Sequence, residues 1–371
     1  MTTGNQSAIE DQARLSEEAA ALNMVAFWDV RGDIEPTEPR PRVHPHVWKW
    51  NEVAPRLHRS AHAIPLESAE RRALLCSNPG LSPKPYMTDT ILAAYSLYNP
   101  GEQAPVHRHT PSASRFLLEG AGGFTTVDGE KCMMRRGDVI LTPNGTWHDH
   151  GNDGDEPIVW MDVLDLPLVE SLNNSIFEFD YRETESQSNT GEPLQRATQQ
   201  IRYPEDHSTQ LYGQGGMVPL FGDKVRGRPG ASPMLIYRGA DIRAQLARLR
   251  DYPADPHDGV IIELVDPVTG GPVMSTLSYR AQLLRPGERT RTHRHTASTI
   301  YCVIEGGGVT RVNDTTLHWE RNDAFCVPGW AWHSFQNTTP DDSVLYSVTD
   351  APTLVKLGLY REEAGASADA S

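Results

Sequence analysis

The sequence predicts an all-β protein built from two similar β-barrels, and three observations lead to this fold class. Short apolar or alternating runs, such as ILAAYSLY, SRFLLEG and IVWMDVLD, are separated by Gly, Pro and Asn, a pattern typical of strands and turns. Similar runs return in the same order in the second half, as LSYRAQLLRPG, STIYCVIEGGG and SVLYSVTD. A chain of 371 residues is also too long for one ordinary core. An internal duplication explains all three observations.

The segments outside the barrels have a different composition. Residues 8–23 are rich in Ala, Leu, Glu and Arg and predict a helix, whereas the following Pro-rich, charged segment through Pro45 predicts an extended arm. The strand pattern begins at about Thr90, and residues 181–229, rich in Gln, Ser, Thr, Gly and Pro, predict a linker. We therefore predict two domains, 1–175 with the arm and first barrel, and 176–371 with the linker and second barrel.

Charge and hydropathy exclude several kinds of partner. Lys and Arg total 34 against 49 Asp and Glu, and the net charge of -15 disfavours nucleic acid and anionic membranes. No stretch approaches the roughly 18 apolar residues of a membrane helix, and the polar, acidic start does not resemble a signal peptide. We expect a cytoplasmic protein. The single cysteines, without CxxC spacing, are expected to be buried and reduced: Cys76, Cys132, Cys302 and Cys326.

Three histidines in the first half form a metal-binding pattern. His107 and His109 stand two apart on a predicted strand, so their side chains project to the same face. His148 follows a Gly- and Pro-containing turn and can complete one triangular face of an octahedral site. An isolated HxH is usually a surface feature, but here the turn spacing, the third histidine and a second copy coincide. We predict that these three residues bind a divalent metal.

These motifs resemble the two motifs of the cupin superfamily, including the spacing of Gly101, Gly120, Gly137, Pro143, Gly145 and Asn152. The resemblance implies a bicupin: two jelly-roll β-barrels from an internal duplication, with an N-terminal helical arm and short linking helices. Many cupins add a glutamate ligand where this chain has Ala113 or Ser114. Three neutral imidazoles leave a divalent iron three open positions, enough for a bidentate anionic substrate and dioxygen.

Over almost the whole chain, further segments resemble the gentisate 1,2-dioxygenase and salicylate 1,2-dioxygenase family. They are HVWKW (His46 to Trp50), ERRAL (Glu70 to Leu74), NPG (Asn78 to Gly80), HRHT, SRFLLEG and GDVILTP. The resemblance implies a cytoplasmic, homotetrameric Fe(2+) enzyme that uses dioxygen to cleave a hydroxybenzoate between its carboxyl- and hydroxyl-bearing carbons. Gentisate, giving maleylpyruvate, is the leading substrate. Salicylate, a 5-substituted salicylate and 1-hydroxy-2-naphthoate are the alternatives.

The resemblance also implies roles for other first-barrel residues. Arg115 matches an arginine that holds the substrate carboxylate, which suits a planar, permanently charged guanidinium; a rim position paired with an acidic residue is the alternative. Arg71 matches a second arginine near the substrate, with the adjacent Arg72 as an alternative. Trp160 and Asp162, two apart on a predicted strand, match residues that line the pocket.

Three more positions bear on catalysis and specificity. His150 stands two residues beyond His148, on the same strand face, and is a candidate acid or base for the phenolic proton. Leu92 and Ser96 stand where some relatives carry Trp and Gln against the far side of the ring. Both residues are smaller here, which predicts a reshaped pocket with room for substituted salicylates or a hydroxynaphthoate.

The second half retains the histidines, so a second metal site is a further prediction, with His293, His295 and His333 as its ligands. Its surroundings differ, because Tyr301 replaces Arg115 and Phe335 replaces His150. We therefore expect the first barrel to carry the chemistry. Two other classes stay open: a Mn(II) or Zn(II) cupin isomerase or decarboxylase, and a non-catalytic binding bicupin. Two intact histidine triads argue against the last.

Overall fold

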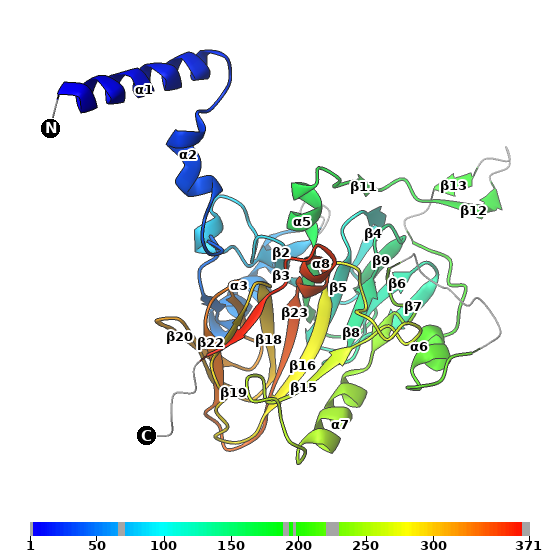
Figure 1. Ribbon diagram of the computed structural model, residues 1–371. Helices are drawn as coiled ribbons and strands as arrows, with labels where there is room; N and C mark the ends of the chain where they lie inside the picture. Colours follow the sequence, from blue (N-terminus) through cyan, green and yellow to red (C-terminus); the bar gives the residue numbers. More distant parts are fainter. Residues whose placement is uncertain (1–2, 66–70, 188–192, 196–197, 220–229, 366–371) are drawn as a thin grey trace. The chain divides into compact units, whose positions relative to one another are not determined.

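The N-terminal unit is helical. The computed structural model describes residues 3–65, 71–187, 193–195, 198–219 and 230–365 (Figure 1). The chain divides into two compact units, Met1–Arg40 and Pro41–Ser371. The first contains helices α1 (Thr3–Ala21) and α2 (Phe27–Ile34). The helical arm is confirmed, but α2 lies in the segment predicted to be extended. There Trp28 Nε1 donates a hydrogen bond to Ser16 Oγ of α1 at 3.0 Å, a contact that local composition does not reveal.

The second unit contains the two predicted barrels (Figure 1). The strands of the first are β2 (Arg72–Leu75), β3 (Leu92–Tyr98), β4 (Gln103–His109), β5 (Ala113–Glu119), β6 (Gly123–Val127), β7 (Glu130–Met133), β8 (Val139–Thr142), β9 (His148–Asn152), β10 (Ile158–Leu164), β11 (Phe177–Glu178) and β14 (Ile236–Tyr237). They form a six-stranded sheet, β14-β8-β5-β10-β3-β2, and a five-stranded sheet, β11-β4-β9-β6-β7.

The second barrel has the same two-sheet plan. Its strands are β1 (His46–Trp48), β15 (Val260–Leu264), β16 (Ser278–Leu284), β17 (His293–His295), β18 (Thr299–Glu305), β19 (Gly307–Val312), β20 (Thr315–Glu320), β21 (Ala324–Val327), β22 (His333–Asn337), β23 (Ser343–Thr349) and β24 (Glu362–Ala364). The sheets run β1-β21-β18-β23-β16-β15 and β20-β19-β22-β17-β24. The predicted duplicated all-β architecture is therefore confirmed.

Short helices and one ribbon connect these strands. The helices are α3 (Trp50–Ala63), the 3₁₀ helix η1 (Pro79–Leu81), α5 (Leu166–Ser171), α6 (His207–Tyr212), α7 (Gly239–Leu249) and α8 (Ala351–Lys356). Strands β12 (Arg182–Gln187) and β13 (Pro193–Gln195) form a separate two-stranded sheet. Parts of the predicted linker, 188–192, 196–197 and 220–229, lie outside the described residues.

Corresponding turns in the two barrels keep one backbone conformation despite different residues. Gly137 and Gly145 adopt φ values of 81° and 65°, and their counterparts Asn322 and Trp330 adopt 68° and 63°. A positive φ is uncommon for a residue as bulky as tryptophan. The duplicated hairpin geometry therefore determines the backbone even where the residue type does not favour it.

The barrels exchange short strands across their boundary. β1 precedes the first barrel in the sequence but pairs with β21 of the second. β14 follows the predicted linker but pairs with β8 of the first. The division between residues 175 and 176 stays a prediction, and these two strands connect the barrels across it.

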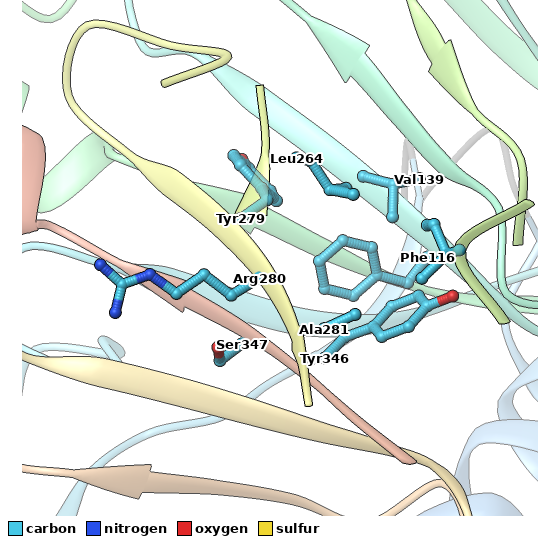
Figure 2. Close-up of a pocket in the computed structure, with 9 residues that line it drawn as sticks. Phe116, Val139, Leu264, Tyr279, Arg280, Ala281, Tyr346 and Ser347 are labelled. Atoms are coloured by element: carbon cyan, nitrogen blue, oxygen red, sulfur yellow. The ribbon is translucent and has the colours of Figure 1, made fainter. Parts of the chain in front are cut away.

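The largest hydrophobic cluster joins the two barrels. Phe116 of the first barrel contacts Tyr279 and Tyr346 of the second edge-on, with ring centroids 6.2 and 6.0 Å apart. The gap that these rings line has no room for a water molecule (Figure 2). Arg280, next to Tyr279 on β16, extends away from the rings (Figure 2). This face is therefore packing between barrels and offers no ligand site.

Two other expectations concern cysteines and membranes. All four cysteines are free and buried, as predicted. Within the described residues, no helix is long and apolar enough to cross a membrane.

Candidate active site

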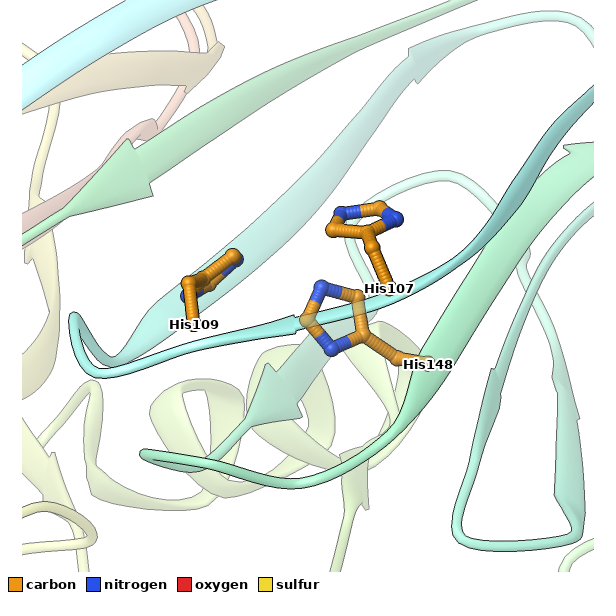
Figure 3. A group of neighbouring side chains, drawn as sticks. All are labelled: His107, His109 and His148. Atoms are coloured by element: carbon orange, nitrogen blue, oxygen red, sulfur yellow. The ribbon is translucent and has the colours of Figure 1, made fainter. Parts of the chain in front are cut away.

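Three buried histidines converge inside the first barrel (Figure 3). His107 and His109 lie on β4, and His148 on β9 pairs directly with His107 across the ladder. One ring nitrogen of each residue lies within 4.8 Å of the other two. The tertiary structure therefore brings together the three side chains that the spacing predicts as metal ligands.

Backbone carbonyls orient the three rings. In each ring Nδ1 lies 2.7–2.9 Å from a carbonyl oxygen two residues away, which can only accept a hydrogen bond. Nδ1 must therefore carry the proton, which leaves the Nε2 lone pair for a metal. The pairs are His107 with Pro105, His109 with Pro111, and His148 with Thr146.

Burial keeps these rings neutral. Desolvation lowers the pKa of His107 to about 3 and that of His109 to about 4, and the charge of Arg71 adds to the effect at His107. The pKa of His148 lies well below its ordinary value, mainly for the same reason. Neutral imidazole is the form that binds metals, so no proton competes for these ligand atoms near neutral pH.

The donor set fits a divalent transition metal. Nε2 of His107 and Nε2 of His148 are buried without a hydrogen-bond partner, which is costly unless a ligand is bound there. Ala113 and Ser114 supply no carboxylate, so the group consists of three histidines. Among the residues that the structure describes, no other set of three His, Cys, Asp or Glu side chains brings its ligand atoms this close.

Arg115 lies inside the barrel rather than at its rim. It is 2% exposed on β5 and stands directly opposite Asp162 of β10. Arg115 Nε lies 2.9 Å from Asp162 Oδ1, an ion pair in which the N–H does not point along the line to the oxygen. Nη1 is buried and also has no hydrogen-bond partner. A buried guanidinium with unfilled donors suits a second carboxylate, such as that of a substrate.

Asp162 has two further partners. Its Oδ2 accepts hydrogen bonds from Trp160 Nε1 at 2.9 Å and from Ser96 Oγ at 2.6 Å. The Ser96 hydroxyl is therefore directed at Asp162. Leu92, the other small residue, belongs to the hydrophobic cluster between the barrels. Roles for these residues at the substrate ring stay predictions.

His150 lies on β9 beside the group of three histidines. Its ring centroid is 5.5 Å from that of His107, and Nδ1 is buried without a partner. Desolvation, followed by the charge of Arg115, holds the pKa of His150 well below its ordinary value. The ring is therefore neutral and a weak base, whose nitrogen lone pair can receive a proton only from a group that binding at the site has made more acidic.

The structure distinguishes the two adjacent arginines. Arg72 is buried and binds Glu102 Oε1 at 2.6 Å and the carbonyl of Ile64 at 2.7 Å, so it serves the fold. Arg71 is half-buried, and its positive charge lowers the pKa of both His107 and His150. The charge of Arg71 thus reaches these histidines, and its role at the substrate stays a prediction. The preceding Glu70 lies outside the described residues.

Three aromatic residues near the site were not predicted. β11 pairs with β4 and sets Phe177 opposite His109, with ring centroids 5.0 Å apart. The ring of Phe179 lies 6.0 Å from that of His107. Tyr98 stacks on Trp160 at 4.8 Å. For Phe177 and Phe179 the alternating run IFEFDY was the available signal, but a short run does not reveal which strand it joins. Tyr98 ends the predicted strand run ILAAYSLY.

The second barrel gathers its own histidines in a different arrangement. His295 and His333 keep the Nδ1 contacts to backbone carbonyls two residues away, at 2.8 and 2.9 Å. His293 does not; its nitrogens lie 3.7 Å from Asp258 Oδ1 and 3.6 Å from Glu362 Oε1. The expected replacements Tyr301 and Phe335 are buried in this barrel. A metal here stays a prediction.

Comparisons with known proteins identify the family. The cupin domain model matches residues 94–164 and 281–349, one segment in each barrel. The 5-aminosalicylate 1,2-dioxygenase of Comamonas sp. is 40% identical over 96% of this chain and 91% of its own length. The chain belongs to the gentisate and salicylate 1,2-dioxygenase family.

Two other members of this family support the assignment. Gentisate 1,2 dioxygenase 1 of Aquipseudomonas alcaligenes is 36% identical over 92% of each chain. The crystal structure of the salicylate 1,2-dioxygenase of Pseudoaminobacter salicylatoxidans, determined as adducts with gentisate, superposes with a TM-score of 0.84 at 32% identity. The match covers 95% of this chain and 94% of that one. The likeness to this dioxygenase family thus extends over both barrels.

Proposed function

We propose that this protein is an iron(II)-dependent ring-cleaving dioxygenase that opens gentisate between its carboxyl-bearing and adjacent hydroxyl-bearing carbons to give maleylpyruvate. The observation that carries the proposal is the buried group of His107, His109 and His148, with Arg115 and His150 in the same barrel. The gentisate adducts of the Pseudoaminobacter enzyme support the substrate class.

His107, His109 and His148 would hold the iron through Nε2. The chemistry supplied by bound iron(II) would be the activation of dioxygen beside a chelated hydroxybenzoate. Both oxygen atoms of dioxygen enter the product, so the reaction needs no other oxidant or reductant.

The protein's own groups bind the substrate and manage one proton. Arg115, whose Nη1 has no hydrogen-bond partner, takes the substrate carboxylate, and the charge of Arg71 adds to the attraction. The ortho hydroxyl loses its proton to the neutral ring of His150, and the phenolate is the more electron-rich ring for attack by oxygen. Phe177 and Phe179 lie next to the histidine rings but are 40% and 53% exposed, so they border the site on its solvent side.

The substrate 5-position is the main open point of specificity. Gentisate has a hydroxyl there and 5-aminosalicylate an amino group, and both donate electrons to the ring. Ser96 is engaged by Asp162 and Leu92 by the hydrophobic cluster, so neither offers a free polar partner to that substituent. A pocket without a directed partner discriminates weakly between such groups. We therefore propose 5-substituted salicylates as additional substrates, with salicylate and 1-hydroxy-2-naphthoate as alternatives.

The test is oxygen uptake by iron-loaded protein with each of these compounds. 3-Hydroxybenzoate, which lacks the ortho pair, is the control. We expect gentisate to be consumed with one equivalent of oxygen and a product heavier by two oxygen atoms. Turnover of 3-hydroxybenzoate but of no ortho hydroxy acid would refute the proposal. Conversion without oxygen would instead favour a Mn(II) or Zn(II) isomerase or decarboxylase.

Three finer points complete the proposal. We place the protein in the cytoplasm, which agrees with its four free cysteines, and propose a homotetramer. The second barrel could bind a further metal through His293, His295 and His333. We assign no ring cleavage to it, because Tyr301 and Phe335 replace the groups that would bind carboxylate and accept a proton.

A further inference from the structure

Three neighbouring strands of the first barrel place four polar or aromatic side chains on one face. β3, β10 and β5 lie side by side, and their register sets Ser96 opposite Trp160, and Asp162 opposite Arg115. Directly opposed residues of antiparallel strands share a face, as do residues two apart on one strand. All four side chains therefore belong to one connected group.

Hydrogen bonds within this group determine how the Asp162 carboxylate is turned. Oδ2 accepts from Ser96 Oγ and from Trp160 Nε1, and Oδ1 faces Arg115 Nε at 2.9 Å. The terminal torsion of an aspartate is soft. Because the Arg115 Nε–H does not point along the line to Oδ1, Trp160 would be the only hydrogen-bond donor left on this carboxylate without Ser96. The Ser96 hydroxyl adds the second donor and restricts that rotation.

The second barrel shows that the fold does not require this group. The same register there pairs Gln282 with Leu345, and Tyr301 with Ser347. No acidic or basic residue stands at any of the four positions, and both amide atoms of buried Gln282 are unpartnered. The barrel nevertheless forms the same sheet. The group in the first barrel therefore has a role other than building the sheet.

We propose that Ser96 is a positioning residue for the substrate carboxylate. Its hydroxyl holds Asp162, Asp162 holds the guanidinium of Arg115 by its Nε edge, and Nη1 is left for the carboxylate. A side chain that binds substrate keeps its geometry only if neighbouring residues hold it in place by hydrogen bonds and packing. The inference rests on the proposed function of Arg115.

The test compares two ligands on anaerobic, iron-loaded protein by equilibrium titration. Salicylate offers a carboxylate and a hydroxyl, whereas catechol offers two hydroxyls and no carboxylate. Ser96→Ala should raise the Kd of salicylate about tenfold and leave that of catechol unchanged, because the defect acts through Arg115. Ser96→Thr, which keeps the hydroxyl, should restore most of the affinity. Gln282→Ala, at the matching position of the second barrel, is the control and should bind both ligands like wild type.

A double-mutant cycle separates this inference from the proposed function. In an Arg115→Leu background, Ser96→Ala should have no further effect on salicylate. If Arg115→Leu itself leaves the salicylate Kd unchanged, the carboxylate role of Arg115 is wrong. If Arg115→Leu weakens salicylate but Ser96→Ala does not, or weakens catechol equally, only the inference is overturned. Ser96→Cys, nearly isosteric with a weaker donor, gives the same comparison should the alanine variant fail to fold.

Discussion

Arg115→Leu should separate stability from substrate binding, because the arginine is both half of a buried ion pair and the proposed carboxylate anchor. Removing one partner of a buried pair costs about 3–5 kcal/mol, mostly from the charge left behind. Asp162 would keep its hydrogen bonds from Ser96 and Trp160. We therefore expect a loss at the lower end, about 3 kcal/mol in the free energy of unfolding.

A second substitution isolates the cause of that loss. In Arg115→Leu/Asp162→Asn the buried charge is gone, while the amide oxygen still accepts from Ser96 and Trp160. We expect this double variant to recover most of the lost stability, since a neutral, hydrogen-bonded group is cheap to bury. Neither variant should regain the substrate carboxylate contact, so the Kd of salicylate should rise roughly ten- to hundredfold in both.

Two measurements decide the outcome. Urea unfolding followed by tryptophan fluorescence gives the free energies, and anaerobic salicylate titration gives the affinities. The reasoning is refuted if Arg115→Leu unfolds at the wild-type midpoint, or if the double variant is no more stable than the single one. Full activity at low gentisate in either variant would show that the carboxylate is held elsewhere.

Other predictions address the metal, the second barrel and pH. His148→Ala should abolish turnover and iron binding in the first barrel while circular dichroism stays that of wild type; metal analysis showing the same iron content as wild type would contradict this. His333→Ala should keep a substantial fraction of gentisate turnover, and a folded, iron-containing but inactive variant would mean that both barrels are needed. Burial raises the pKa of Asp165 and of Asp350 to about 6, so the folded protein holds protons that the unfolded chain, with a pKa near 3.8, has released. These carboxyl groups therefore make stability fall as pH rises from about 4 to about 6. Asp165→Asn and Asp350→Asn should each gain roughly 1–3 kcal/mol relative to wild type between pH 4 and 7, measured by unfolding at both pH values.

The group of His107, His109 and His148 was predictable because its information is local. An HxH pair on a strand places both side chains on one face, and a turn with a glycine at positive φ brings the next strand back. The duplication made the pattern more specific, since the histidines recur at a nearly constant offset. Whether His293, His295 and His333 bind a metal depends on how the His293 ring lies between Asp258 and Glu362. The spacing of residues along the sequence does not determine that position.

By itself, the sequence determined the all-β class, the two barrels, the family and the three first-barrel histidines, because strand periodicity, turn residues and motif spacing are properties of short windows. Only the tertiary structure decided which distant segments of the chain contact one another. Ser96 and Asp162 lie on adjacent strands although 66 positions separate them, and Phe177 reaches His109 only because β11 joins β4. β1 and β14 likewise cross between barrels. Such pairings depend on packing between segments far apart in the chain, and no local pattern specifies the energy of those contacts.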